Sequence, residues 1–147
     1  MTTENIKSLR EQTGAGVMDA KRALEEAGGD IAKAIEIIQK KGLVKAEKRI
    51  ERTTGAGLIV SYIHNDRIGV LLDIRCETDF VARTDDFREL AHNVAMHIAA
   101  MNPLNMEDLL AEPFIKDQGL SIENLVKGVI AKVGENIRIE KFCYYAL

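Results

Sequence analysis

The chain has little tryptophan, proline or cysteine, and too few cysteines for the disulfide framework of a small secreted protein. Its 147 residues include no tryptophan, two prolines and two cysteines. Cys76 and Cys143 lack the CxxC spacing of a zinc or redox motif. Each is expected to be a small buried hydrophobe in a reducing compartment, with an exposed thiol at a subunit edge as the alternative for Cys143. No apolar run approaches the length of a membrane-spanning helix, and the N-terminus lacks a signal-peptide core. We therefore expect no membrane partner and a cytoplasmic location.

The chain also lacks a strong charge of either sign. Its net charge is -3, so no basic field is available to hold a nucleic-acid backbone, and no direct nucleic-acid partner is expected. Hydrophobic residues make up 46% and charged residues 29%, which is normal for a folded globular protein. The length suits one domain, or a small module with a modest core.

The N-terminal part has the periodicity of three short helices between residues 4 and 41. The first ends at Thr13-Gly14, the second spans Val17 to Ala27, and Asp30 caps a third that is predicted to end at Gly42. None is long enough to be stable alone, so the three are expected to pack together. The mixed charges of residues 43–54 predict a solvated linker, helical or extended. Residues 1–53 are thus interpreted as a helical module with its linker.

Residues 54–147 are predicted to form a second domain. Two apolar runs, Leu58–His64 and Ile68–Cys76, flank a turn and predict a β-hairpin. Further elements are expected at Asp85–Met101, which Thr84 would cap, at Ile122–Lys132, and at a bulged final strand, Ile137–Tyr145. The fold class is α+β: a helical module, then an antiparallel sheet of at least three strands with helices packed on one face.

No pattern for catalysis is present. The segment TGAGVMDAK lacks the spacing of a phosphate-binding loop and is interpreted as a turn between helices. His64, His92 and His97 lack the spacing of a zinc pair and a neighbouring nucleophile, so they are interpreted as surface or interface histidines. We expect a protein that is not an enzyme and has no catalytic residues, cofactor or metal site.

The segment RCETDFVAR, residues 75–83, places a large aromatic residue where a loop should begin. Loops normally lie in water and large aromatics normally do not, so Phe80 either folds back into the core or contacts another protein. Met96 and His97 fall off the apolar stripe of the 85–101 helix. Either could pack at the core edge, but together with Phe80 they suggest a protein-binding surface.

Five segments carry a resemblance to a known family: LREQTGAGVMDAKRALEEAGGDIAKAIE, IGVLLDIRCETDFVAR, AMHIAAMNP, PFIKD and GENIRIEKF. In this order they resemble the elongation factor Ts family, the nucleotide exchange factors of bacterial translation. The resemblance implies a ubiquitin-associated-like N-terminal module and elongation factor Tu·GDP as the partner. It implies that Thr78, Asp79, Phe80 and Val81 enter the GTP-binding domain near the magnesium site and promote GDP release. Asp79 would fix the orientation of Phe80, and His97 and Met96 would supply secondary contacts.

The sequence departs from the family in two ways. It holds one core unit where longer members hold two, so a homodimer through the core sheet is expected to replace the duplication, with the final strand and Cys143 near the interface. The connection from Pro103 to Pro113 is also shorter than in many relatives. Two other readings remain: a helical adaptor that uses only the first module, and a small ligand-binding α+β protein.

Overall fold

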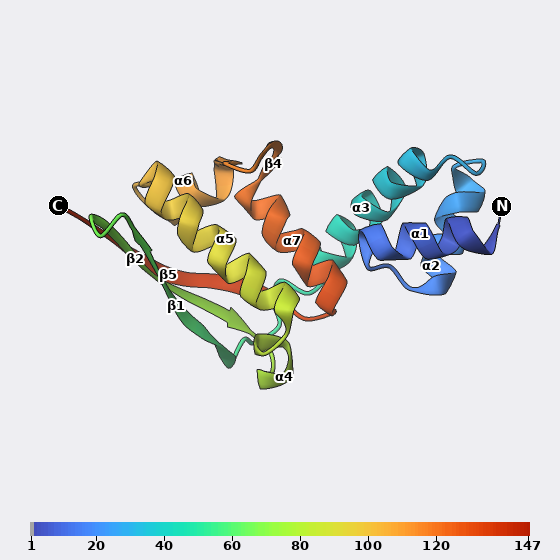
Figure 1. The fold of residues 1–147 in the computed structure, drawn as a ribbon. Helices are drawn as coiled ribbons and strands as arrows, with labels where there is room; N and C mark the ends of the chain where they lie inside the picture. Colours follow the sequence, from blue (N-terminus) through green and yellow to red (C-terminus); the bar gives the residue numbers. More distant parts are fainter. Residues whose placement is uncertain (1) are drawn as a thin grey trace.

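The computed structural model describes residues 2–147 and is elongated, with a helical module at one end and the C-terminus at the other (Figure 1). The predicted three-helix module is confirmed and comprises α1 (Thr3–Thr13), α2 (Val17–Glu26) and α3 (Ile31–Glu47). Residue 1 of the predicted 1–53 unit lies outside the described residues. The helices pack around a small apolar core formed by Leu9, Ala20, Ala23, Leu24 and Ala34. The segment TGAG is the turn between α1 and α2, with Gly14 in the left-handed conformation.

The prediction that the third helix ends at Gly42 is wrong. Helix α3 continues through Gly42 to Glu47, because the glycine lies where α3 packs against α7 and not at a helix end. Residues 43–54, which were predicted to be a solvated linker, are also less free than expected. Their charged side chains are mostly exposed, but Ala46, in the last turn of α3, is buried in the apolar core beneath the sheet. The side-chain nitrogen of Asn136 donates hydrogen bonds to the backbone carbonyl oxygens of Ile50 and Arg52. The module is therefore attached to the core through packed backbone.

The predicted antiparallel sheet of at least three strands is confirmed: β1 is Ala56–His64, β2 is Ile68–Cys76 and β5 is Ile137–Ala146. The strand order is β1–β2–β5. Three residues join the paired strand ends His64 and Ile68, and two of them, Asn65 and Asp66, have positive φ of 51° and 57°, a conformation that Asn and Asp tolerate in turns. The expected bulge in β5 is present, because the pairing with β2 shifts between Asp73 and Ile74 and leaves Glu140 unpaired.

The remaining elements lie on one face of the sheet (Figure 1). They are α5 (Asp85–Met101), α6 (Met106–Ala111), β3 (Pro113–Phe114), β4 (Asp117–Ser121) and α7 (Ile122–Val133). Thr84 caps α5 through its hydroxyl oxygen, as predicted, and Ser121 caps α7 in the same way. The core between sheet and helices includes Leu72, Ile74 and Phe87, all fully buried. The α+β fold class is thereby confirmed.

The opposite face of the sheet carries no element of residues 2–147. Four large apolar side chains on it are exposed: Ile59, Ile63, Leu71 and Tyr145. Cys143 pairs with Leu71 in the register and is exposed as well, whereas Cys76 is buried. The expectation of a buried thiol is thus right for Cys76 and wrong for Cys143, which is exposed. Its place at a subunit edge stays a prediction. No helix among residues 2–147 is long and apolar enough to cross a membrane.

A candidate partner-binding site at the end of the hairpin

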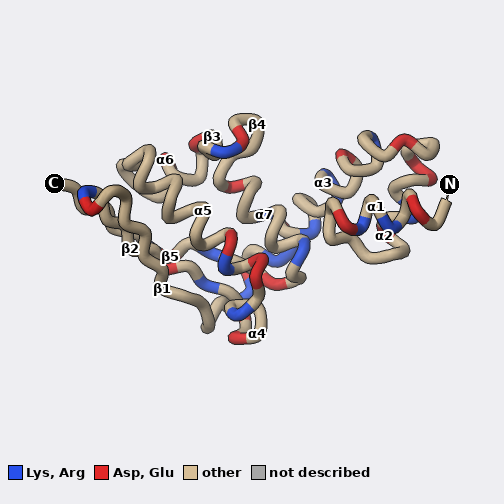
Figure 2. Tube along the Cα trace, in the orientation of Figure 1, with Lys and Arg blue, Asp and Glu red and all other residues tan. Residues whose placement is uncertain are grey.

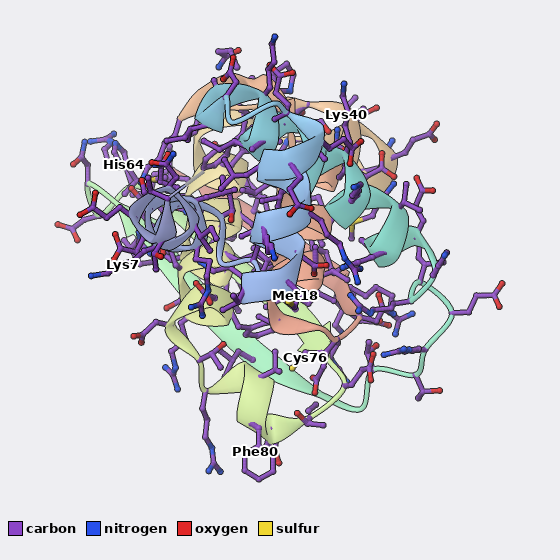
Figure 3. The ribbon with its side chains drawn as sticks, turned by 90° about the vertical axis from the view of Figure 1, so that its right-hand side faces the viewer. Lys7, Met18, Lys40, His64, Cys76 and Phe80 are labelled. Carbon is purple, nitrogen blue, oxygen red and sulfur yellow. The ribbon has the colours of Figure 1, made fainter. Side chains whose placement is uncertain are left out.

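A single helical turn, α4 (Asp79–Ala82), follows β2 at the end of the sheet and lies below the start of α5 (Figure 1). Its second residue is Phe80, which is 85% exposed and points away from the rest of the molecule (Figure 3). The next two residues, Val81 and Ala82, are buried in the main core. The turn therefore has an anchored inner side and an outer side that holds one aromatic ring. Phe80 does not fold back into the core.

Thr78 connects this turn to the rest of the domain. Its hydroxyl oxygen accepts a hydrogen bond from the backbone N–H of Val81 at 3.4 Å, which caps α4. The same hydroxyl donates to Oε2 of Glu135 at 2.8 Å, and the backbone N–H of Thr78 donates to Oε1 at 3.0 Å. One carboxylate thus accepts two hydrogen bonds from the residue that starts the turn.

The thiol of Cys76 lies beneath the turn and donates to the carbonyl oxygen of Thr78 at 3.2 Å. Burial raises the pKa of this thiol, and the negative charge of Glu135 raises it further. The thiol is therefore held in its protonated form, which is the form that donates this hydrogen bond. Cys76 acts here as a small buried group that supports the backbone of Thr78.

Asp79 is exposed and borders an open hollow of about 310 Å³, together with Gly57, Asp73 and Arg75. The expectation that Asp79 fixes the orientation of Phe80 is not met within the chain. Among residues 2–147 no donor hydrogen-bonds its carboxylate, whereas Asp73 is paired with Arg75. The Asp79 carboxylate is thus available to a donor on another molecule, and the backbone on either side of Asp79 and Phe80 is held by the Thr78 cap and by buried Val81.

Lys, Arg, Asp and Glu gather where the linker, α4 and the start of β5 meet, as Figure 2 shows. The far end of the sheet, apart from its hairpin turn, shows few of them. Phe80 therefore projects from a charged part of the surface. A ring at such a place is accessible to a partner and is flanked by groups that can form polar contacts around it.

The predicted position of His97 on an exposed surface is wrong. The ring is fully buried, with Nε2 2.7 Å from Oε2 of Glu112. Nδ1 accepts a hydrogen bond from the backbone N–H of Ile115 at 3.3 Å, so the neutral tautomer with its proton on Nε2 satisfies both partners. Residues 112–115 fold back over this end of α5 and cover the ring. The helix periodicity of residues 85–101 alone contains no sign of that cover.

Met96 is half-buried on the same helix. Both Met96 and His97 lie toward the C-terminal end of α5, whereas α4 precedes its N-terminal end (Figure 1). The structure therefore does not gather the two sets of predicted site residues into one site, and a contact of either residue with a partner stays a prediction. Nor do His64 and His92 form a metal site: no group of three or more His, Cys, Asp or Glu suited to a metal occurs among residues 2–147.

Three residues that support the turn were not predicted from the sequence: Glu77, Glu135 and Asn136. A carboxylate oxygen of Glu77 accepts a hydrogen bond from the backbone N–H of Asn136 at 2.7 Å, beside the contact between Thr78 and Glu135. Glu135 and Asn136 belong to the segment GENIRIEKF, but nothing in that segment alone indicates a contact with a residue 57 positions earlier. Only the pairing of β2 with β5 brings the two segments together.

Comparison with known proteins identifies the family. Residues 77–147 match the family model described as elongation factor TS. The protein named elongation factor Ts from Thermotoga petrophila is 44% identical over 186 aligned positions, which cover 97% of this chain and 94% of the relative. Those of Fervidobacterium nodosum and Petrotoga mobilis are 43% and 40% identical, over 97% and 100% of this chain and 95% and 98% of the relatives.

The chain belongs to the elongation factor Ts family. It therefore has the role of a translation elongation factor. Because 186 positions are aligned with a chain of 147 residues, the elongation factor Ts of Thermotoga petrophila has residues that this chain lacks. The segment Thr78–Val81 lies within the region matched by the family model.

Proposed function

We propose that this elongation factor Ts is a guanine nucleotide exchange factor: it binds elongation factor Tu·GDP and inserts Phe80 near the magnesium site, which releases GDP. The observation that carries the proposal is the 85% exposure of Phe80 on a turn whose neighbouring residues are buried. Thr78 and Val81 hold the turn, Asp79 offers a free carboxylate beside the ring, and Phe80 enters the partner. The protein acts by binding and has no catalytic residue of its own.

The energetics favour such a role for the ring. An aromatic side chain that becomes fully buried at an interface contributes about 2 kcal/mol or more when it is an anchor. The usual cost of ordering a flexible loop is reduced here, because Thr78 caps the turn and Val81 and Ala82 are already packed. Most of the binding free energy of the ring is therefore available to displace groups around the nucleotide.

Nucleotide exchange then follows from linkage. If the exchange factor and GDP each weaken the binding of the other to the GTPase, the factor displaces GDP and is in turn displaced by GTP. A coupling free energy of about 3 kcal/mol corresponds to a change of more than a hundredfold in affinity. This scheme requires no covalent step, and it places the protein in the cytoplasm with its GTPase. The helical module and Met96 supply further contacts, whereas buried His97 acts only through the segment that covers it.

The test follows the dissociation of a fluorescent GDP from elongation factor Tu. The wild-type protein is expected to accelerate dissociation, and Phe80→Ala to lose most of the acceleration while it remains folded. Leu104→Ala is the matched control, because Leu104 is 89% exposed but lies beyond the far end of α5. Equal acceleration by wild type and Phe80→Ala would remove Phe80 from the mechanism, and no acceleration by any variant would contradict the exchange function.

The same assay separates the two other readings of the sequence. A protein without residues 1–53 would lose all binding if the chain were only a helical adaptor. It would lose almost none if the core sheet bound a small ligand. An exchange factor is expected to keep the Phe80 contact but to bind elongation factor Tu more weakly, because the module no longer contributes.

We further propose that a second copy of the chain covers the bare face of the sheet. Ile59, Ile63, Leu71 and Tyr145 form an apolar surface there, and the same face carries the oppositely charged pairs Asp73–Arg75 and Arg138–Glu140. Such a surface is self-complementary under twofold symmetry. Sedimentation of the wild type is expected to show a dimer that Leu71→Lys converts to a monomer. A monomeric wild type would contradict the proposal.

A further inference from the structure

Two segments meet beneath α4, and in each of them a backbone N–H donates a hydrogen bond to a glutamate carboxylate of the other. Glu135 accepts from the backbone N–H of Thr78, and Glu77 accepts from the backbone N–H of Asn136. We call these four residues the carboxylate clasp. Hydrogen bonds to a charged carboxylate are about twice as strong as those between neutral groups. The clasp therefore joins the end of β2 to the start of β5 at the point where the Phe80 turn begins.

The turn depends on this clasp because it is too short to be stable by itself. Helix α4 has four residues, and a single helical turn does not form in isolation. Its first N–H groups need an acceptor, which the Thr78 hydroxyl provides to Val81. That hydroxyl in turn donates to Glu135 at 2.8 Å, so the carboxylate orients the capping oxygen. Loss of Glu135 would free both the cap and the backbone of Thr78.

Asn136 extends the clasp to the linker. It is buried, and its side-chain nitrogen donates to the carbonyl oxygens of Ile50 and Arg52 at 3.2 and 2.9 Å. The guanidinium of Arg52 also lies 3.6 Å from the carboxylate of Glu77. The linker after the helical module and the turn that carries Phe80 are therefore bound to two consecutive residues, Glu135 and Asn136.

We propose that Glu135 is a positioning residue that holds Phe80 in its partner-binding orientation, and that Asn136 ties this orientation to the linker. The proposal rests on the exchange function proposed above. Glu135 is half-buried behind the turn and is bonded to Thr78, so it acts through the turn and does not itself need to touch the GTPase. A helical module docked on the GTPase would then hold Phe80 through the linker and the clasp, which Asn136 joins.

A double-mutant cycle in the GDP-release assay tests this role. Glu135→Ala is expected to reduce the acceleration about tenfold. Glu135→Ala/Phe80→Ala is expected to be no worse than Phe80→Ala alone, because Glu135 acts only through the ring. Glu123→Ala is the matched control: Glu123 is an exposed glutamate of α7 that pairs with Lys127. Losses that simply add in the double variant, or full activity of Glu135→Ala, would overturn the proposal.

A second measurement needs no partner and so separates this proposal from the exchange function. Amide hydrogen exchange of residues 78–83 is expected to rise in Glu135→Ala and to stay unchanged in Glu123→Ala. Asn136→Ala is expected to raise exchange in residues 50–53 as well as 78–83. If the wild type does not accelerate GDP release but these shifts occur, the exchange function fails and the clasp stands. Unchanged exchange at 78–83 in Glu135→Ala overturns the clasp whatever the release assay shows.

If Glu135→Ala does not fold, Thr78 provides the same test from the other side of the hydrogen bond. Thr78→Ala removes the hydroxyl that joins the cap to Glu135, whereas Thr78→Ser keeps it. Thr78→Ser is expected to retain several times more acceleration, and slower amide exchange at residues 79–83, than Thr78→Ala. Equal values for the two variants in both measurements would overturn the proposal.

Discussion

Helices α3 and α7 approach each other closely at Gly42 and Ala131: a Cβ atom added at Gly42 would lie 3.1 Å from the Cβ atom of Ala131. This contact joins the helical module to the core, and the module reaches the linker and the clasp through the same helix. Glycine in the interior of a helix is normally unfavourable by about 1 kcal/mol relative to alanine. Its presence at position 42 is explained by the small distance between the helices.

Replacing Gly42 by a large residue is therefore expected to separate the two helices. Gly42→Leu should lower the free energy of unfolding by about 1–3 kcal/mol, the usual cost of overpacking. The control is Gly128→Ala, at a position of α7 where an added Cβ meets no atom within 4 Å. That change should raise the free energy of unfolding by about 0.4–1 kcal/mol. Urea denaturation of the three proteins gives both values, and an unchanged midpoint for Gly42→Leu would contradict the close packing.

Gly57 is the second glycine with a defined structural reason. Its φ is +152°, and an added Cβ would collide with the carbonyl oxygen of Ile74. Because that obstacle is backbone in the central strand, Gly57→Ala is expected to distort the pairing of β1 with β2 and to lower the free energy of unfolding by about 2 kcal/mol or more. Gly55→Ala, where an added Cβ meets nothing, should change it by less than about 0.5 kcal/mol. Thermal unfolding of both variants checks the difference.

Most of the fold is predictable from local sequence patterns. The alternating residues of β1 and β2, the turn at Asn65-Asp66 and the cap at Thr84 each act over a few neighbouring positions. The same locality explains the error at Gly42. A glycine near the end of an apolar stripe predicts a helix terminus, and only the position of α7 shows that the glycine is needed for packing.

The candidate site was predictable in part. An aromatic residue placed directly after a strand drew attention to Phe80, and its exposure is a finding of the structure. The groups that hold it were not predictable, because the contact between Thr78 and Glu135 depends on the pairing of distant strands. His97 was misplaced for a similar reason, since its cover comes from residues 112–115 on another element.

The buried position of His97 gives a prediction for stability. His97→Leu would leave the backbone N–H of Ile115 and the carboxylate of Glu112 without their partner, and each unsatisfied group costs about 1–3 kcal/mol. The free energy of unfolding is expected to fall by about 2–4 kcal/mol. Met96→Leu, a volume-conserving change at the adjacent half-buried position, should cost less than about 1.5 kcal/mol. Equal unfolding midpoints for the two variants in guanidinium chloride would show that the His97 hydrogen bonds contribute nothing to stability.

The pair Asp73–Arg75 on the bare face of the sheet gives a prediction for pH dependence. The Arg75 guanidinium donates to both carboxylate oxygens of Asp73, at 2.5 and 2.9 Å, although Asp73 is nearly buried. These hydrogen bonds lower the pKa of Asp73 below its usual 3.8, and the effect exceeds the opposite effect of burial. A carboxyl group with a lower pKa in the folded state contributes stability above its unfolded pKa and loses it as pH falls through the folded value.

The free energy of unfolding of the wild type is therefore expected to fall as pH is lowered from about 4, through the loss of this pair. Asp73→Asn should be less stable than the wild type at pH 7, and the difference should shrink as the pH drops below about 4, because the wild type then loses the charge that the variant lacks. The matched change Asp66→Asn, in the exposed hairpin turn, removes a carboxylate that forms no ion pair among the described residues. Denaturant unfolding between pH 7 and pH 3 measures all three proteins. A difference between wild type and Asp73→Asn that stays constant over this range would show that Asp73 titrates alike in the folded and unfolded states, and the Arg75 hydrogen bonds would then have no effect on its pKa.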